Sequence, residues 1–186
     1  DIMDGHYVRN FSFGIDLVPA LKKHLEIPVV VHLEISHPDS FIAEFSAAGA
    51  DMIVVQEDTC PNLPYTVDAI LESGSVPGVG VNPDRHFRRI EAHPHILREI
   101  GLLIVMGVNP GFGGQRFAET TEENIREAVR LRETHGGNYD IGVDGGVNLE
   151  TTPGIVAAGA NYLIAGSSVY SGTVEDNMRA LWAAAS

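Results

Sequence analysis

Residues 102–115, LLIVMGVNPGFGGQ, contain the pattern that decides the fold. Leu102–Val108 is a continuous apolar run, and Asn109–Gln115 is a glycine-rich loop that follows it directly. Continuous apolar strands are typical of parallel sheets, because helices cover both faces or the strands line a closed barrel. The stretch therefore predicts one unit of an alternating α/β fold, with a loop of bare backbone at the carboxyl end of its strand.

Similar runs recur along the chain. Further strands are expected at Pro28–Ile35, Asp51–Gln56, Pro77–Asn82, Tyr139–Asp144 and Asn161–Gly166, and Asp1–Asp4 has the pattern of the end of another. Helices are expected between them, at Asp39–Ala48, Tyr65–Ser73, Thr120–Thr134 and Thr173–Ala185. The order of these segments is that of repeated strand–helix units.

Capping residues mark the ends of the expected helices. Asp39, Thr120 and Thr173 stand where an N-terminal cap is expected, and Glu123 completes a capping box with Thr120. A glycine follows three of the helices, where a left-handed residue ends a helix with little strain. Trp182, in the last helix, is expected to pack against its neighbours.

Alternating strand–helix units close either as an open doubly wound sheet or as a (β/α)8 barrel. No GxGxxG sequence follows any strand, which disfavours a dinucleotide-binding sheet. Seven strands in 186 residues fall short of the eight strands and about 250 residues of a complete barrel. We therefore expect one domain over residues 1–186, a TIM (β/α)8 barrel that is N-terminally truncated and lacks its first βα unit.

Composition excludes several classes of protein. Twelve Lys and Arg residues against 25 Asp and Glu give a net charge of −13, which repels the phosphate backbone of nucleic acids. No apolar run approaches the ~18 residues of a membrane span, and no signal segment is expected. The single cysteine, Cys60, is typical of a reducing compartment, so a cytoplasmic location is expected. Whether the chain forms a homo-oligomer stays open.

Three ionisable residues lie in or at the ends of expected strands. Alternation along the first strand sends Asp1 and Met3 to the same face, where an inward carboxylate needs a cation or a proton. His32 interrupts an apolar strand, and Asp144 ends one directly before two glycines. Each also has a structural interpretation: a cap or solvated turn for Asp1, a satisfied core histidine for His32, and an Asx turn for Asp144.

Glycine-rich loops follow three expected strands. They are Asn109–Gln115, Gly145-Gly146 and Gly166-Ser167-Ser168. Successive backbone N–H groups in such loops form a concave anion site, and a phosphate site after the last strands recurs in barrels. Arg116 is the only basic residue near them, so recognition through backbone amides is favoured over salt bridges. The alternative is three ordinary turns.

Taken together, these motifs resemble those of the ribulose-phosphate 3-epimerase family. DIMDGHYVRN is similar to that family's DVMDGHFVPN, and MGVNPGFGGQRF to its MTVNPGFGGQKF. PVVVHLEISHP, IGVDGGVN and IAGSSVY resemble three of its other strand ends, in the same order along the chain. The resemblance implies a TIM barrel and an isomerase of the pentose phosphate pathway that interconverts D-ribulose 5-phosphate and D-xylulose 5-phosphate.

The resemblance also implies the roles of individual residues. One divalent metal ion (Zn, Fe, Mn or Co) would be held by Asp1, His32 and Asp144, with a fourth ligand, a histidine two positions before Asp1, outside this sequence. Asp1 and Asp144 would act as the catalytic acid–base pair through an enediolate. The implied substrate- and phosphate-binding residues are Met3, His32, Met106, Gly111, Phe112, Gly113, Gly114, Asp144, Gly145, Gly146, Gly166 and Ser167.

Departures from the family pattern concern the sugar end of the site. Glu34 stands in place of a usual methionine, Gln56 of a common histidine, and Arg9 of a proline. A related ketose phosphate such as D-allulose 6-phosphate is therefore an alternative substrate, and a non-catalytic phosphate-binding barrel is a second alternative. An aldolase or decarboxylase barrel is disfavoured, because the only lysines, Lys22 and Lys23, lie in a further segment expected to be helical, before the strand at Pro28–Ile35, and not at a strand end.

Overall fold

The computed structural model describes residues 1–112 and 114–186, and its centre is a sheet of seven parallel strands. The strands are β1 (Ile2–Met3), β2 (Val30–Glu34), β3 (Met52–Gln56), β4 (Val76–Val81), β5 (Leu102–Met106), β6 (Asp140–Asp144) and β7 (Tyr162–Ile164). Each strand pairs with the next one along the chain, so the order in the sheet is β1 to β7 without a reversal. All seven expected strands are confirmed.

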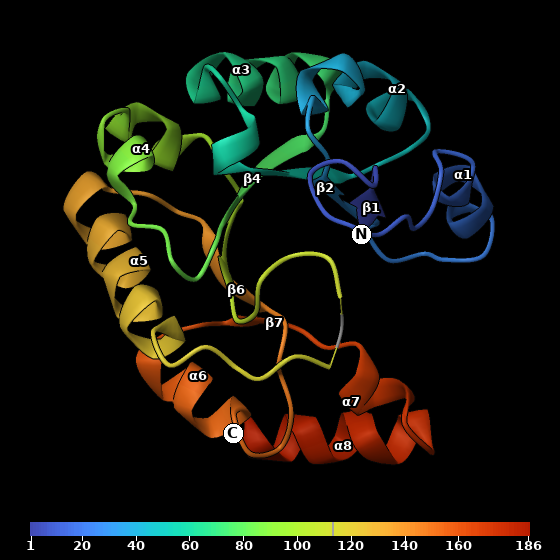
Figure 1. The fold of residues 1–186 in the computed structure, drawn as a ribbon, viewed down its shortest axis with the longest axis vertical. Coiled ribbons are helices and arrows are strands. Elements are labelled where there is room, and N and C mark those ends of the chain that lie inside the picture. The colour runs from blue at the N-terminus through green and yellow to red at the C-terminus, as the bar shows by residue number, and fades with distance from the viewer. Residues whose placement is uncertain (113) are drawn as a thin grey trace.

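Helices cover the outer side of this sheet (Figure 1). They are α1 (Leu17–Lys22), α2 (Ile42–Ala47), α3 (Leu63–Ser73), α4 (Arg88–Glu91), α5 (Thr121–His135), α6 (Thr152–Ala158), α7 (Ser167–Tyr170) and α8 (Val174–Ala184). Three short 3-10 helices span Pro38–Ser40, Glu57–Thr59 and Pro94–Arg98. Among the residues described, none of these helices has the length and hydrophobicity to cross a membrane.

The strand order decides between the two closures that the sequence allows. A doubly wound sheet reverses its strand order at a switch point, and helices then cover both faces. Here the order never reverses, and right-handed crossovers of one sense place every helix on the same face of the sheet. Such a sheet curls on itself in the manner of a barrel, so its inner face is enclosed by the strands alone.

Strand alternation separates two apolar layers. On β5, Leu103 and Val105 belong to the large core between sheet and helices, whereas Ile104 and Met106 belong to a small cluster on the inner face. The same alternation on β2 sends Leu33 outward into the large core. The polar residues that interrupt the strands, among them His32 and Asp144, consequently face the interior at the carboxyl ends.

The expected helices at Asp39–Ala48, Tyr65–Ser73, Thr120–Thr134 and Thr173–Ala185 are found as α2, α3, α5 and α8 with small shifts at their ends. Gly49, Gly74 and Gly136 follow the first three, each with a positive φ, as expected of left-handed helix stops.

The expected side-chain caps are not formed. Asp39 lies in the 3-10 helix before α2 and accepts a hydrogen bond from the Thr66 hydroxyl at 2.7 Å. The Thr120 hydroxyl donates to the carbonyl of Pro83 at 3.0 Å, so the capping box with Glu123 is absent from α5. Thr173 occupies the N-cap position of α8 without a capping bond in the described structure. Asp39 and Thr120 therefore form hydrogen bonds with residues far away in sequence and not with the backbone at the start of the adjacent helix.

Trp182 is also placed differently from the expectation. Its side chain is 78% exposed on α8, and Met178, one turn earlier on the same helix, is exposed as well. The residue of α8 that packs inward is Leu181, one position before the tryptophan. A large aromatic residue in a helix is therefore no indication of burial when its neighbour occupies the inward position.

Asp4 fixes the loop after β1 to the end of β2. Its carboxylate accepts hydrogen bonds from the backbone N–H groups of His6, Tyr7 and Ser36, each at 2.8 Å. Burial alone would raise the pKa of Asp4, but the backbone hydrogen bonds from Ser36, His6 and Tyr7 outweigh it and lower the pKa to about 2.

Replacement of Asp4 with alanine is expected to lower the free energy of unfolding by about 1–2 kcal/mol, because three N–H groups lose their acceptor. The pKa is lower in the folded chain than its ordinary value of 3.8, so this stabilisation is complete above that value and is lost as the pH falls through about 2. Urea unfolding of both chains across this acidic range measures the difference. A difference that stays constant with pH would contradict the assignment.

Candidate active site

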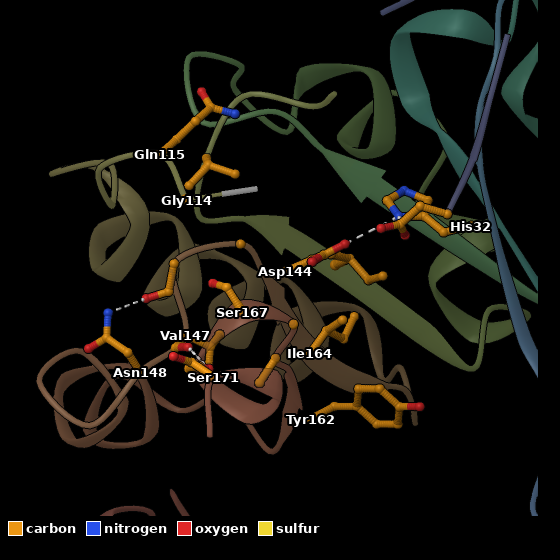
Figure 2. A pocket seen from close by; sticks show the side chains of 18 of the residues that line it. His32, Gly114, Gln115, Asp144, Val147, Asn148, Tyr162, Ile164, Ser167 and Ser171 are labelled. Carbon is orange, nitrogen blue, oxygen red and sulfur yellow. Dashed lines mark hydrogen bonds and ion pairs between the residues drawn. The ribbon is translucent and has the colours of Figure 1, made fainter. Parts of the chain in front are cut away.

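Asp1, His32 and Asp144 converge at the carboxyl ends of the strands. The Nδ1 atom of His32 lies 3.5 Å from Oδ1 of Asp1 and 3.4 Å from Oδ2 of Asp144. One ligand atom from each of the three residues lies within 4.8 Å of the others. Figure 2 shows Asp144 pointing toward His32. The three residues that the sequence predicts as metal ligands therefore form one cluster.

This convergence depends on the curl of the sheet. Asp1 precedes β1, and Asp144 ends β6, which is five strands away in the sheet. At about 4.8 Å between neighbouring strands, a flat sheet would hold the two aspartates about 24 Å apart. Because the sheet is curled, their carboxylates instead meet on its inner face beside His32.

The cluster has the donor set of a divalent cation. His32 is only 4% exposed, and its buried Nδ1 has no hydrogen-bond partner within the described part of the chain. Two carboxylates flank this nitrogen, and like charges so close together repel each other unless a cation or a proton lies between them. One imidazole nitrogen with two carboxylate oxygens fits Zn²⁺, Fe²⁺, Mn²⁺ or Co²⁺.

A cavity of about 810 Å³ extends from this cluster to the glycine-rich loops. Eight of the sequence-predicted site residues line it: Asp1, His32, Gly114, Asp144, Gly145, Gly146, Gly166 and Ser167. In Figure 2, Gly114 and Ser167 lie on the side of Asp144 away from His32. The cavity thus has a carboxylate–histidine end and an end formed by backbone.

Four other predicted site residues, Met3, Met106, Gly111 and Phe112, are not among those that line this cavity. Met106 is buried in the inner apolar cluster, and Met3 lies beside Glu34 in the register of β1 and β2. Gly111 is buried against Val8, and Phe112 is 56% exposed. Gly113 lies outside the described residues.

Gly145 and Gly146 have a steric reason to be glycine. Both have positive φ angles, 92° and 72°. A Cβ atom on Gly145 would collide with Val108, and one on Gly146 would lie 2.8 Å from the ring of Phe117. Any larger residue would therefore disturb the loop that follows Asp144.

Side chains to which the sequence analysis assigned no role hold this loop in shape. The Asn148 amide and the Thr151 hydroxyl both donate to the carbonyl of Gly146, at 3.1 and 2.7 Å. Ser168 donates to the carbonyl of Val147 at 2.6 Å. With these carbonyls engaged by side chains, backbone N–H groups of the loop are left for an anion. In the sequence, these side chains are indicated only by a cluster of Asn, Thr and Ser residues beside the glycines, a pattern that is typical of turns.

Gln115 plays the same part in the loop after β5. Its amide donates to the carbonyls of Asn109 and Phe112, both at 2.7 Å, and its side chain lines the cavity. This glutamine therefore folds the glycine-rich loop back on itself. The sequence analysis quoted it as the end of the loop without assigning it a role.

Replacement of Asn148 with alanine is expected to raise the KM for a phosphate substrate about tenfold with a smaller change in kcat, because the loss of about 1–1.5 kcal/mol of hydrogen bonding loosens the loop. Steady-state kinetics measure both constants. Asn161→Ala is the matched control: it removes hydrogen bonds to Ile141 and Asp140 at the opposite ends of the strands. An equal rise in KM in both variants would contradict a role of Asn148 at the site.

Polar residues also crowd the ends of β2 to β4. Glu34 is 2% exposed; burial raises its pKa, His32 opposes the rise, and the Asp144 charge adds to it. Nearby, the Tyr7 hydroxyl donates to Asp58 at 3.0 Å and accepts from Asn82 at 2.8 Å. Glu34 also accepts a backbone hydrogen bond from Gly111, so this polar group adjoins the loop after β5.

The fold and the site together define a class of protein: an α/β barrel with glycine-rich loops and a carboxylate–histidine centre at the carboxyl ends of its strands. The sequence profile of the ribulose-phosphate 3 epimerase family matches residues 1–170. The chain belongs to this family, whose members are isomerases, and the resemblance inferred from the motifs is confirmed.

Relatives support the same assignment. The chain is 43% identical over 171 residues to a ribulose-phosphate 3-epimerase of Bacillus subtilis (strain 168), covering 91% of this chain and 77% of the relative. It is 38% identical over 174 residues to one of Rhodobacter capsulatus, covering 92% and 73%. The expected enzyme class, an epimerase among the isomerases, is confirmed.

Solved structures confirm the barrel type of fold. KGPDC from Streptococcus mutans superposes with a TM-score of 0.72 at 15% identity, covering 92% of this chain and 79% of that one. Orotidine 5'-phosphate decarboxylase from Pyrococcus horikoshii OT3 gives a TM-score of 0.68 at 20% identity, covering 92% and 80%. At these identities the likeness concerns the fold alone.

Proposed function

We propose that this chain is a metal-dependent 3-epimerase that interconverts D-ribulose 5-phosphate and D-xylulose 5-phosphate. The observation that carries the proposal is the pair of carboxylates, Asp1 and Asp144, on either side of His32 at one end of a cavity whose other end is formed by glycine-rich backbone. A ketose phosphate has matching ends: an anion, and a carbonyl next to a carbon that can lose a proton.

Inversion at C3 requires two proton-transfer groups, one for each face of the carbon. One aspartate takes the C3 proton, and the electron pair of the broken C–H bond moves toward the C2 carbonyl, which gives a planar enediolate. The other aspartate, protonated, donates its proton to the opposite face of C3. One carboxyl group has then gained a proton and the other has lost one, and exchange with solvent restores the pair.

Asp1, His32 and Asp144 would hold the divalent cation. When bound, it would act as a Lewis acid that stabilises the negative charge developing on the substrate oxygens. The two carboxylates repel each other at this distance, and the charge of the cation would offset that repulsion. His32 contributes a neutral nitrogen, and burial excludes water from its side of the site.

The glycine-rich loops would hold the phosphate. Gly114, Gly145, Gly146, Gly166 and Ser167 present backbone to the cavity, and α7 begins at Ser167. Recognition by neutral N–H groups suits a chain with a net charge of −13, since it needs no basic side chain. Anchoring the phosphate there would place the other end of the ketose beside the carboxylates.

A ketose phosphate with one more carbon, such as D-allulose 6-phosphate, is the second candidate substrate. Glu34 favours it, because its buried Oε2 atom has no hydrogen-bond partner among residues 1–112 and 114–186. Proton NMR in D2O separates the two: deuterium enters C3 of D-ribulose 5-phosphate if the first proposal is right, and C3 of the allulose ester alone if the second is. If deuterium enters C3 of neither ketose phosphate, both proposed substrates are wrong.

Three further expectations stay predictions. The chain is predicted to form one domain over residues 1–186. It is also predicted to act in the cytoplasm, because its only cysteine, Cys60, forms no disulfide and is typical of a reducing compartment. A ketose phosphate is its predicted small-molecule partner. Analytical ultracentrifugation would establish whether it acts as a homo-oligomer.

A further inference from the structure

A glutamine of the barrel interior contacts His32 directly. Nε2 of Gln56 lies 3.0 Å from Nε2 of His32, and the two residues are on the neighbouring strands β3 and β2. Gln56 is fully buried (0% exposed). Its Oε1 atom is buried and has no hydrogen-bond partner within the described residues. A buried amide whose oxygen accepts no hydrogen bond lowers the stability of the fold, so the presence of glutamine at position 56 needs an explanation.

The barrel makes room for this glutamine. Gly80 of β4 pairs with Gln56 in the strand register. A Cβ atom on Gly80 would lie 2.9 Å from Nε2 and 3.0 Å from Oε1 of Gln56. The missing side chain on Gly80 therefore leaves the space in which the amide lies against the ring of His32.

The orientation of the Gln56 amide matches one tautomer of a neutral His32 ring. The Gln56 NH2 group only donates, so Nε2 of His32 accepts, and the proton of the neutral ring lies on Nδ1. Nδ1 is the atom that faces the carboxylates of Asp1 and Asp144. This tautomer directs an N–H group at two anions, which is favourable while no cation is there.

A cation bound by Nδ1 needs the opposite tautomer, because a metal ligand must offer a lone pair. The ring proton then lies on Nε2 and requires an acceptor. Rotation of the Gln56 amide by half a turn supplies one, since Oε1 takes the place of Nε2. Partners of this kind fix the orientation of metal-binding histidines.

We propose that Gln56 is a positioning residue that acts through His32: its amide supports one tautomer of the ring without metal and, rotated, the other tautomer with metal. The inference rests on the metal site of the proposed function. Glutamine suits this position because its amide both donates and accepts. A glutamate would only accept, and a methionine of similar length would do neither effectively.

Two variants and two measurements test this role. Gln56→Met removes both hydrogen-bonding groups with little change in volume, and Gln56→Glu keeps only the acceptor. 15N NMR of the imidazole nitrogens, at a pH above the titration of histidine, reports the tautomer of His32 in the metal-free chain. Titration with Co²⁺, followed by its absorption spectrum, reports metal affinity independently of turnover.

In the wild-type chain without metal, the spectrum is expected to show the proton of His32 on Nδ1, and with Zn²⁺ on Nε2. Gln56→Glu should show it on Nε2 in both states, with Co²⁺ affinity at least as high as in the wild type. Gln56→Met should bind Co²⁺ about 10–100-fold more weakly. Ser75→Ala, which removes a buried hydroxyl that donates to Ala50, is the control for general loss of stability and should bind Co²⁺ normally.

Unchanged tautomers and unchanged Co²⁺ affinity in both Gln56 variants would overturn the proposal. Equal losses of affinity in Gln56→Met and Ser75→Ala would do the same, since they would indicate a structural role only. If the wild-type chain takes up no Co²⁺, the metal part of the proposed function fails, and the metal-free spectra of the three chains still decide whether Gln56 sets the tautomer.

Discussion

Asp144→Asn is expected to lower kcat for ketose-phosphate epimerisation by about 10²–10⁴-fold, because one of the two proton-transfer groups is lost. Asparagine keeps the size of the side chain and one oxygen, so the cavity and its glycine-rich loops should be unchanged. Binding of a phosphate ester, measured by calorimetry, should therefore stay close to that of the wild type. Steady-state kinetics in both directions measure the loss of turnover.

The same strand offers a matched control. Asp140 begins β6 at the end of the sheet far from the site, where it accepts a hydrogen bond from Asn161. Asp140→Asn makes the same chemical change on the same strand and should leave kcat near the wild-type value. Activity of Asp144→Asn above about a tenth of the wild type would show that this carboxylate is not an acid–base group.

Removal of divalent metal by a chelator is expected to lower turnover by about 10²-fold or more, since Lewis-acid stabilisation of the transition state is worth several kcal/mol. Adding back Zn²⁺, Mn²⁺ or Co²⁺ to the dialysed chain should restore it. Metal analysis together with activity measures both effects.

His32→Gln tests whether the metal acts at the described cluster. The amide is a much weaker ligand than imidazole, so this variant should need a far higher metal concentration for the same activity. Full activity of the metal-free wild type would contradict the metal-dependent mechanism. Unchanged metal requirement in the variant would place the metal at another site.

The sequence was sufficient for the strands and for their alternation. Buried runs such as Leu102–Val108 are long enough, and apolar enough, to predict a strand without knowledge of its neighbours. The same alternation puts His32 and Glu34 on one face of β2, because Leu33 between them belongs to the large outer core. The barrel, and with it the curl of the sheet, was predicted from the number of strands and the absence of GxGxxG. That Asp1 and Asp144 meet at one site was indicated only by the resemblance to a family.

Side chains with several available partners were predicted less well. Asp39 and Thr120 are good caps by residue type, and each instead contacts a segment far away in sequence, at Thr66 and Pro83. A local motif is weakened whenever a tertiary hydrogen bond competes with it. The hydrogen bond from Asn148 to Gly146 was missed for another reason, because an ordinary turn residue has the same sequence pattern.

Glu34 in β2 and Gln56 in β3 show most clearly what a comparison of sequences alone does not predict. Comparison with the family pattern identified Glu34 and Gln56 as unusual and assigned them to the sugar end of the site. Neither lines the described cavity. Gln56 contacts His32, and its space depends on Gly80 across the sheet, a relation between three strands that no single stretch of sequence contains.

Deuterium exchange in single-aspartate variants tests the two-carboxylate mechanism most directly. Asp1→Asn and Asp144→Asn are each incubated in D2O with D-ribulose 5-phosphate and, separately, with D-xylulose 5-phosphate, and NMR follows the proton on C3. We predict that each variant exchanges C3 of one epimer only, that the two variants select opposite epimers, and that neither interconverts them. Exchange of the same epimer by both variants would contradict the two-carboxylate mechanism. Interconversion of the epimers by either variant above about a tenth of the wild-type rate would contradict it as well.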